Sequence, residues 1–175
     1  MQGQRGFTLV ELLIVVALIA ILASVAVYLG SKQISSARSS EVPALFAEFH
    51  NRQNQYKVEQ GQGRFLSTGS NESDYWPASP PTNSSRTFAP IPDTWRALNM
   101  KPPKTSLYCS YVAIAGDAND GSNIGGKAAA FSFTTPPANW YYLLAECNFD
   151  GDSAVNSFYF ASSVNVHIAE EKPGR

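Results

Sequence analysis

The longest apolar segment of the chain runs from Phe7 to Val27, and its one charged residue is Glu11. As an α-helix it would be about 32 Å long, enough to cross a hydrocarbon core of about 30 Å. Such a helix is apolar on all sides, so it needs a membrane or other apolar helices around it. A carboxylate is costly in that setting, and a functional reason for Glu11 is therefore the default hypothesis.

The segment 41–59 has a different pattern, in which apolar residues recur along one face of a helix. This apolar face carries Val42, Leu45, Phe46, Phe49 and Tyr56. The spacing predicts that one helix extends from Phe7 to Glu59, about 80 Å in all. We expect a kink at Pro43 and an end at Gly61 and Gly63.

The rest of the chain reads as a long loop followed by strands. Residues 64–104 are rich in Pro, Ser, Asn and Thr, which predicts a packed loop rather than regular structure. Beyond it, aromatic and β-branched runs bounded by Gly, Pro, Asp and Asn predict strands joined by short antiparallel connections. These are Leu107–Ala115, Ala128–Thr134, Trp140–Cys147 and Asn156–Ser162, with a short fifth at Ser163–Ala169. The expected fold class is α+β, with the amphipathic half of the helix packed on a four-to-five-stranded antiparallel sheet.

The N-terminus carries a specific pattern of residues. Arg5 and Gly6 come directly before Phe7, and Glu11 follows four residues after that phenylalanine. With the length of the apolar run, this segment resembles the N-terminus of type IV prepilins. The resemblance covers the first ~30 residues strongly and the rest only by architecture, which is that of the pilin fold.

The resemblance implies specific roles for three residues. A prepilin peptidase would cut between Gly6 and Phe7, and Phe7 would become the N-methylated first residue. Glu11 would then pair with the positive N-terminus of a neighbouring subunit, since each charge lowers the other's desolvation penalty. The implied partners are the peptidase, the inner-membrane assembly platform and other pilin subunits in a homo- or hetero-polymer.

The sequence departs from the common pilin pattern at two positions. Ala20 and Tyr28 stand where many pilins have a Gly and a Pro, helix breakers that are associated with local unwinding of the helix in assembled pili. Two other interpretations of the N-terminus stay open. A cleaved secretory signal would end near Ser24–Ala26, and a plain single-span anchor would explain the length but not Glu11 or Gly6.

These features divide the chain into five parts. We expect a leader peptide, a membrane or filament-core helix, its amphipathic continuation, a helix-to-sheet loop and the sheet of a globular head. Their bounds are 1–6, 7–29, 30–60, 61–106 and 107–175.

Composition excludes some classes of function. The net charge of −1 becomes −2 when the leader with Arg5 is removed, and the basic residues are scattered. Neither feature is typical of a nucleic-acid-binding protein, so DNA is expected as a partner only in the role of a transported ligand. Cys109 and Cys147 are the only cysteines, and an even pair in an exported domain indicates a disulfide, with two buried free thiols as the alternative.

Few residues suggest chemistry in the head. Asn148, Asp150 and Asp152 alternate oxygen ligands as calcium loops do, although plain turns explain the same pattern and the bidentate Glu of an EF-hand is missing. No other cofactor is expected. His50 and His167 lack evident partners, and no nucleophile has the spacing of a catalytic motif. The sequence therefore predicts a protein that is not an enzyme.

The function that this combination favours is a structural subunit of a type IV pilus, major or minor, serving adhesion, twitching motility or DNA uptake. Such a protein would cross the inner membrane once before assembly and lie in an extracellular pilus afterwards. One alternative is a pseudopilin of a type II secretion system, in a periplasmic pseudopilus. Another is a membrane-tethered adhesin that does not polymerise.

Overall fold

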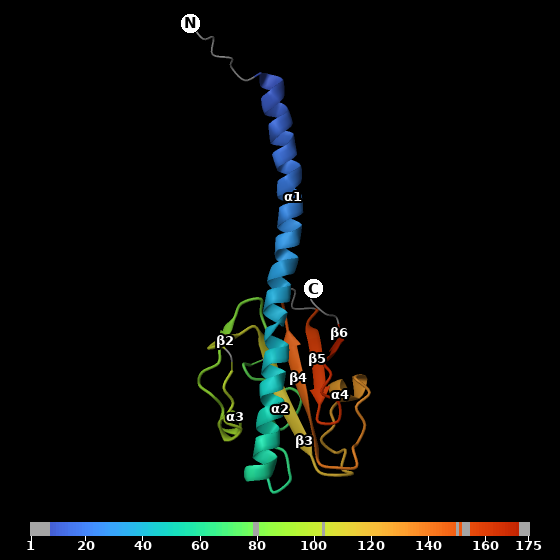
Figure 1. The fold of residues 1–175 in the computed structure, drawn as a ribbon. Helices are drawn as coiled ribbons and strands as arrows, with labels where there is room; N and C mark the ends of the chain where they lie inside the picture. The colour runs from blue at the N-terminus through green and yellow to red at the C-terminus, as the bar shows by residue number, and fades with distance from the viewer. Residues whose placement is uncertain (1–7, 79–80, 103, 150, 152–154, 172–175) are drawn as a thin grey trace.

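The computed structural model describes residues 8–78, 81–102, 104–149, 151 and 155–171, with the side chains of 27–32 left aside. Two helices follow each other along one rod, α1 (Leu9–Ser39) and α2 (Glu41–Glu59). Figure 1 shows α1 projecting from a compact head, while α2 lies across the sheet of that head. The long N-terminal helix predicted from the sequence is thus present, but it is interrupted at one residue.

The interruption lies at Ser40 rather than at Pro43, where the sequence predicted a kink. Pro43 has no N–H, so the carbonyl of Ser39 loses the partner that the next turn would supply. Pro43 falls in the first turn of α2, where its amide needs no partner within the helix. The break between α1 and α2 therefore lies within one turn of Pro43, where the missing N–H has its effect.

The main sheet has four antiparallel strands in the order β3-β4-β5-β6. They are β3 (Cys109–Gly116), β4 (Trp140–Cys147), β5 (Ser157–Ser162) and β6 (Ala169–Glu171). A separate two-stranded sheet joins β1 (Arg86–Thr87) to β2 (Ser106–Leu107), and α3 (Asp93–Ala97) lies in the segment between them. This arrangement is an α+β fold, as the sequence predicted.

Two of the predicted strands are wrong. The segment Ala128–Thr134 is not a strand; its start belongs to the short helix α4 (Gly126–Ala130). The predicted fifth strand, Ser163–Ala169, is a connection up to its last residue, where β6 begins. The first error has a physical cause: three consecutive alanines are strong helix formers, and the carboxylate of Glu72 accepts hydrogen bonds from the first amides of α4.

The two faces of the main sheet are covered by different elements. On one face, the predicted apolar side of α2 is buried against β3 and β4, with Phe46 and Phe49 at its centre. On the other, α4 and the residues after it cover Trp140, Tyr142 and Phe160. Burial of apolar surface on both faces supplies the main driving force for folding of the head.

Candidate functional site

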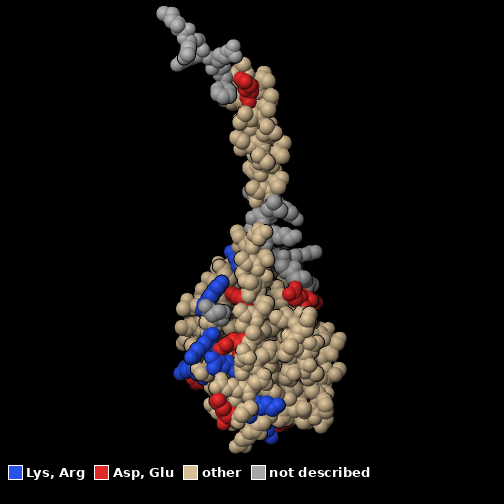
Figure 2. Space-filling view, viewed as in Figure 1, with Lys and Arg blue, Asp and Glu red and all other residues tan. Residues whose placement is uncertain are grey.

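The first part of α1 is an apolar surface with no head residues against it. The segment Leu9–Ala26 is long and apolar enough to cross a membrane, and none of it is buried. Its large side chains are between 48% and 81% exposed. Figure 2 shows this part of the rod as uncharged except near its tip, where Glu11 is the one acidic residue of the segment.

Glu11 forms a capping box with Thr8 at the start of α1. The Thr8 hydroxyl accepts a hydrogen bond from the Glu11 amide at 3.2 Å, and Glu11 Oε2 accepts from the Thr8 amide at 2.9 Å. The Thr8 hydroxyl also donates to Oε2 at 2.9 Å. Such a box satisfies amides that a helix start leaves free. An ionised carboxylate can accept further donors beyond these, so the box leaves Glu11 able to receive a cation.

The predicted cleavage site, Gly6 and Phe7, lies outside the described residues. The structure therefore does not test the cleavage or the methylation, and both stay predictions. Thr8 is the first described residue, and its extended backbone makes it the N-cap of α1. The helix that carries Glu11 thus begins within two residues of the predicted new N-terminus.

Cys109 and Cys147 form a disulfide. They are directly opposite each other at the ends of the paired strands β3 and β4. The sequence placed them in the first and third predicted strands. They are nearest neighbours here because the segment between those strands forms α4 and its loop rather than a strand.

Glu41 anchors the start of α2 to the sheet, a role that was not predicted. Its carboxylate accepts hydrogen bonds from the amides of Tyr108 and Cys109, the latter at 2.8 Å, and from the Tyr111 hydroxyl at 2.9 Å. The side chain is 3% exposed, and burial raises its pKa although these donors act in the opposite direction. Its position one turn before Leu45, on the buried face of α2, is the sequence signal that could have revealed it.

The proposed calcium ligands are only partly described. Asn148 is buried, and its Oδ1 accepts a hydrogen bond from the Gly151 amide at 2.7 Å, as in an ordinary turn. Asp150 and Asp152 lie outside the described residues. Among the residues that are described, no group of three or more His, Cys, Asp or Glu side chains is placed to hold a metal ion. The calcium site therefore stays an untested prediction.

The two histidines have different surroundings. The ring of His50 contacts the Tyr141 hydroxyl through Nδ1, and burial lowers the pKa of His50. His167 is exposed on the segment before β6. The structure places the two histidines on separate elements, α2 and this C-terminal segment.

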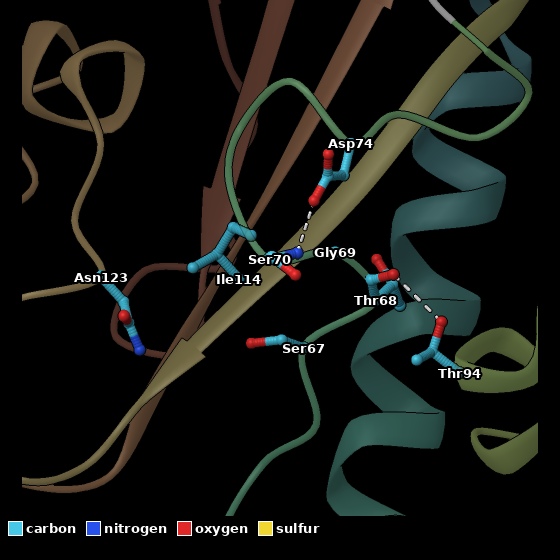
Figure 3. A pocket seen from close by; sticks show the side chains of 8 residues that line it. All are labelled: Ser67, Thr68, Gly69, Ser70, Asp74, Thr94, Ile114 and Asn123. Carbon is cyan, nitrogen blue, oxygen red and sulfur yellow. Dashed lines mark hydrogen bonds between the residues drawn. The ribbon is translucent and has the colours of Figure 1, made fainter.

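A polar cavity of about 540 Å³ lies beside β3 (Figure 3). Its hydroxyl groups are occupied with the strand: Thr68 Oγ1 accepts from the Ala113 amide and Ser67 Oγ from the Ala115 amide, each at 2.8 Å. Figure 3 also shows Asp74 accepting from the Ser70 amide, at 2.7 Å. These bonds pair the outer edge of β3 with the segment that lines the cavity, so that edge of the sheet is covered.

Comparison with known proteins identifies the N-terminal segment. Residues 1–27 match the family model for the prokaryotic N-terminal methylation motif. The chain carries a type IV pilin or pseudopilin leader. No curated protein and no solved structure matches the chain. The motif is typical of structural proteins rather than enzymes. Proteins that carry it are made as membrane-anchored precursors, processed by prepilin peptidase, and assembled with other pilins.

Proposed function

We propose that this chain is a structural subunit of a type IV pilus that polymerises through α1. The observation that carries the proposal is a membrane-length apolar helix, exposed on all sides, which projects from the head and holds one carboxylate at its tip. Exposed apolar surface of this extent needs either lipid or other apolar helices. In a filament core, the identical helices of other subunits surround α1 with apolar side chains once the subunit leaves the lipid bilayer.

Glu11 sets the register of assembly in this proposal. Within the apolar core, its carboxylate pairs with the methylated amino group of Phe7 on a neighbouring subunit. The capping box with Thr8 holds the carboxylate at the helix tip and leaves it able to accept that additional donor. A subunit in the wrong register would leave both charges buried and unpaired, which costs several kcal/mol.

The test is filament assembly in the host cell. Filaments are sheared from cells, and mass spectrometry determines where the chain in them begins. We expect a chain that starts at methylated Phe7 in the sheared fraction. A Glu11→Ala variant should still be processed but should fall by about tenfold or more in filaments, because one partner of a buried pair is missing.

Glu59→Ala is the matched control, because this exposed glutamate lies at the far end of α2 and should leave assembly unchanged. Normal incorporation of Glu11→Ala, or a working protein that keeps residues 1–6, would contradict the proposal. A processed chain that stays in the periplasm and never reaches the sheared fraction would instead indicate a secretion pseudopilus.

A further inference from the structure

A polar cluster lies on the face of the main sheet that is remote from α2. It is formed by Lys127 of α4, Glu146 of β4 and Asn156, the residue directly before β5. Asn156 Nδ2 donates to Glu146 Oε1 at 2.8 Å, and Lys127 Nζ lies 3.9 Å from Glu146 Oε2. Glu146 is 7% exposed. One buried carboxylate therefore contacts both an amine and a carboxamide.

Two aromatic rings contact the amine of Lys127, whose side chain is 40% exposed. Its Nζ lies 4.0 Å from the centroid of the Phe158 ring and 5.1 Å from that of Tyr75. Glu72 fixes the backbone beneath it, because its two carboxylate oxygens accept from the amides of Lys127 and Ala128 at 2.9 and 2.8 Å. The backbone of Lys127 is thus fixed, while its side chain stays partly exposed.

Asn156 and this amine contact the two oxygens of the same carboxylate, Glu146. Phe158 is opposite Glu146 in the register of β4 and β5, and Asn156, the residue before β5, donates to the same Glu146 carboxylate. Among the described residues, Asn156 Oδ1 is a buried oxygen with no hydrogen-bond partner. A buried carbonyl oxygen without a donor is costly. The contact of the same carboxamide with the buried Glu146 carboxylate suggests a reaction at this carbonyl.

We propose that Lys127 and Asn156 become joined by an intramolecular amide bond, with Glu146 as the catalytic acid and base. Glu146 takes one proton from the Lys127 ammonium, and the neutral amine attacks Cγ of Asn156. The new bond joins Lys127 Nζ to that carbon, and the bond from Cγ to Nδ2 breaks. Protons pass through Glu146 to the leaving nitrogen, so one ammonium ion departs and the carboxylate is regenerated.

The reaction needs no oxidant, nucleotide or metal, because an amide replaces an amide. The fold brings the amine and the carboxamide to one buried carboxylate and partly excludes water from it. Both factors make an intramolecular attack more effective. The long, flexible stem of lysine allows its Nζ to swing from Glu146 towards the neighbouring Cγ. The Arg86 guanidinium interacts electrostatically with Glu146 and offsets its negative charge within the cluster.

The bond would tie α4 to β5, whereas the disulfide ties β3 to β4. The disulfide would then hold one pair of elements, β3 and β4, and the amide bond would hold another, α4 and β5. If the chain is a filament subunit, as proposed above, such a head would resist unfolding under tension. The chemistry itself does not depend on that function.

Mass spectrometry of the full-length chain, purified in detergent, tests the bond. The protein is reduced, alkylated and cleaved after glutamate, which separates residue 127 from residue 156 at Glu146. We expect one branched product that contains both segments and is lighter than their sum by one ammonia. Two separate peptides of unmodified mass would overturn the proposal, and so would ammonia loss confined to the Asn156 peptide, which marks a cyclic imide.

Two variants assign the roles. Lys127→Arg keeps the positive charge but removes the nucleophile, and Glu146→Gln keeps the shape but removes the proton carrier. Neither should give the branched product, while Lys104→Arg, an exposed control, should give it in full. Circular dichroism verifies that each variant is folded. Because Glu146→Gln loses the cleavage site between residues 127 and 156, this variant is digested with chymotrypsin, which cuts after aromatic residues such as Trp140. A branched product from folded Glu146→Gln in that digest would exclude Glu146 as the catalyst.

Discussion

At the scale of single residues, Glu41 is the clearest case of a charge placed by the fold. Its carboxylate is buried at the start of α2, where two backbone amides and the Tyr111 hydroxyl point at it. Desolvation raises its pKa, and the hydrogen bonds only partly offset that effect. Glu41 therefore connects helix and sheet, and the cost of burying its ionised carboxylate makes the stability of the head depend on pH.

This shift predicts a pH-dependent stability. The native state binds a proton at Glu41 more tightly than the unfolded state, whose pKa is about 4.5. The proton-linked part of its contribution is therefore fully present below pH 4.5 and is lost as the pH rises through the folded pKa, while the ionised carboxylate still accepts its hydrogen bonds. Glu41→Gln should remove this dependence, as measured by urea unfolding of the head between pH 4 and 7.

Glu41→Ala should lower the free energy of unfolding by about 3 kcal/mol at neutral pH, because it leaves buried donors without an acceptor. Glu59→Gln, at an exposed position, is the control and should change neither quantity. An unchanged pH profile in Glu41→Gln would show that Glu41 has the same pKa in the folded and unfolded chains.

At the scale of elements, the disulfide closes the pair of strands on which the rest of the sheet is built. The cysteines are separated by 38 residues, and a cross-link of that span stabilises by about 4 kcal/mol in the chain-entropy model. A Cys109→Ala, Cys147→Ala double variant should lose roughly this amount. Chemical denaturation of the oxidised protein, the reduced protein and the variant measures it; a loss below about 1 kcal/mol would contradict the prediction.

Elements were predictable where their signal is local. Trp140–Cys147 is a strand with the predicted bounds, since the aromatic residues at its start favour the extended state and the residues on both of its faces are buried. The segment Ala128–Thr134 failed for the opposite reason. Phe131 and Phe133 alternate as in a strand, but they pack side by side on Phe160 after a helix whose cap, Glu72, lies more than fifty residues earlier. No local pattern contains that contact.

The same distinction applies to the candidate sites. Glu11 was recognisable because its setting, an apolar run, is contiguous in sequence. Glu41 and the contacts of Glu146 depend on strands that meet only after folding, so a single sequence offers no spacing rule for them. The cysteine pair lies between these cases, because composition predicts a bond and the register of β3 with β4 shows why it forms.

At the scale of the whole molecule, the first part of α1 is separable from the head, whereas its last turn contacts the head through Arg38. The side chains of Leu9–Ala26 are exposed, while the head buries its own core around α2 and both faces of the sheet. A fragment of residues 31–175 should therefore fold as a soluble monomer. Its midpoint of thermal unfolding should stay within about 4 °C of that of the full-length protein in detergent, a difference equivalent to no more than about 1 kcal/mol.

The full-length chain should instead require detergent and form oligomers as the detergent is diluted, because the exposed apolar rod then has only other rods to contact. Light scattering and thermal melts on the two proteins compare these properties directly. Aggregation of the 31–175 fragment, or a midpoint lowered by more than about 8 °C, would mean that the first part of α1 stabilises the head. The rod would then be part of the folded domain rather than an independent assembly element.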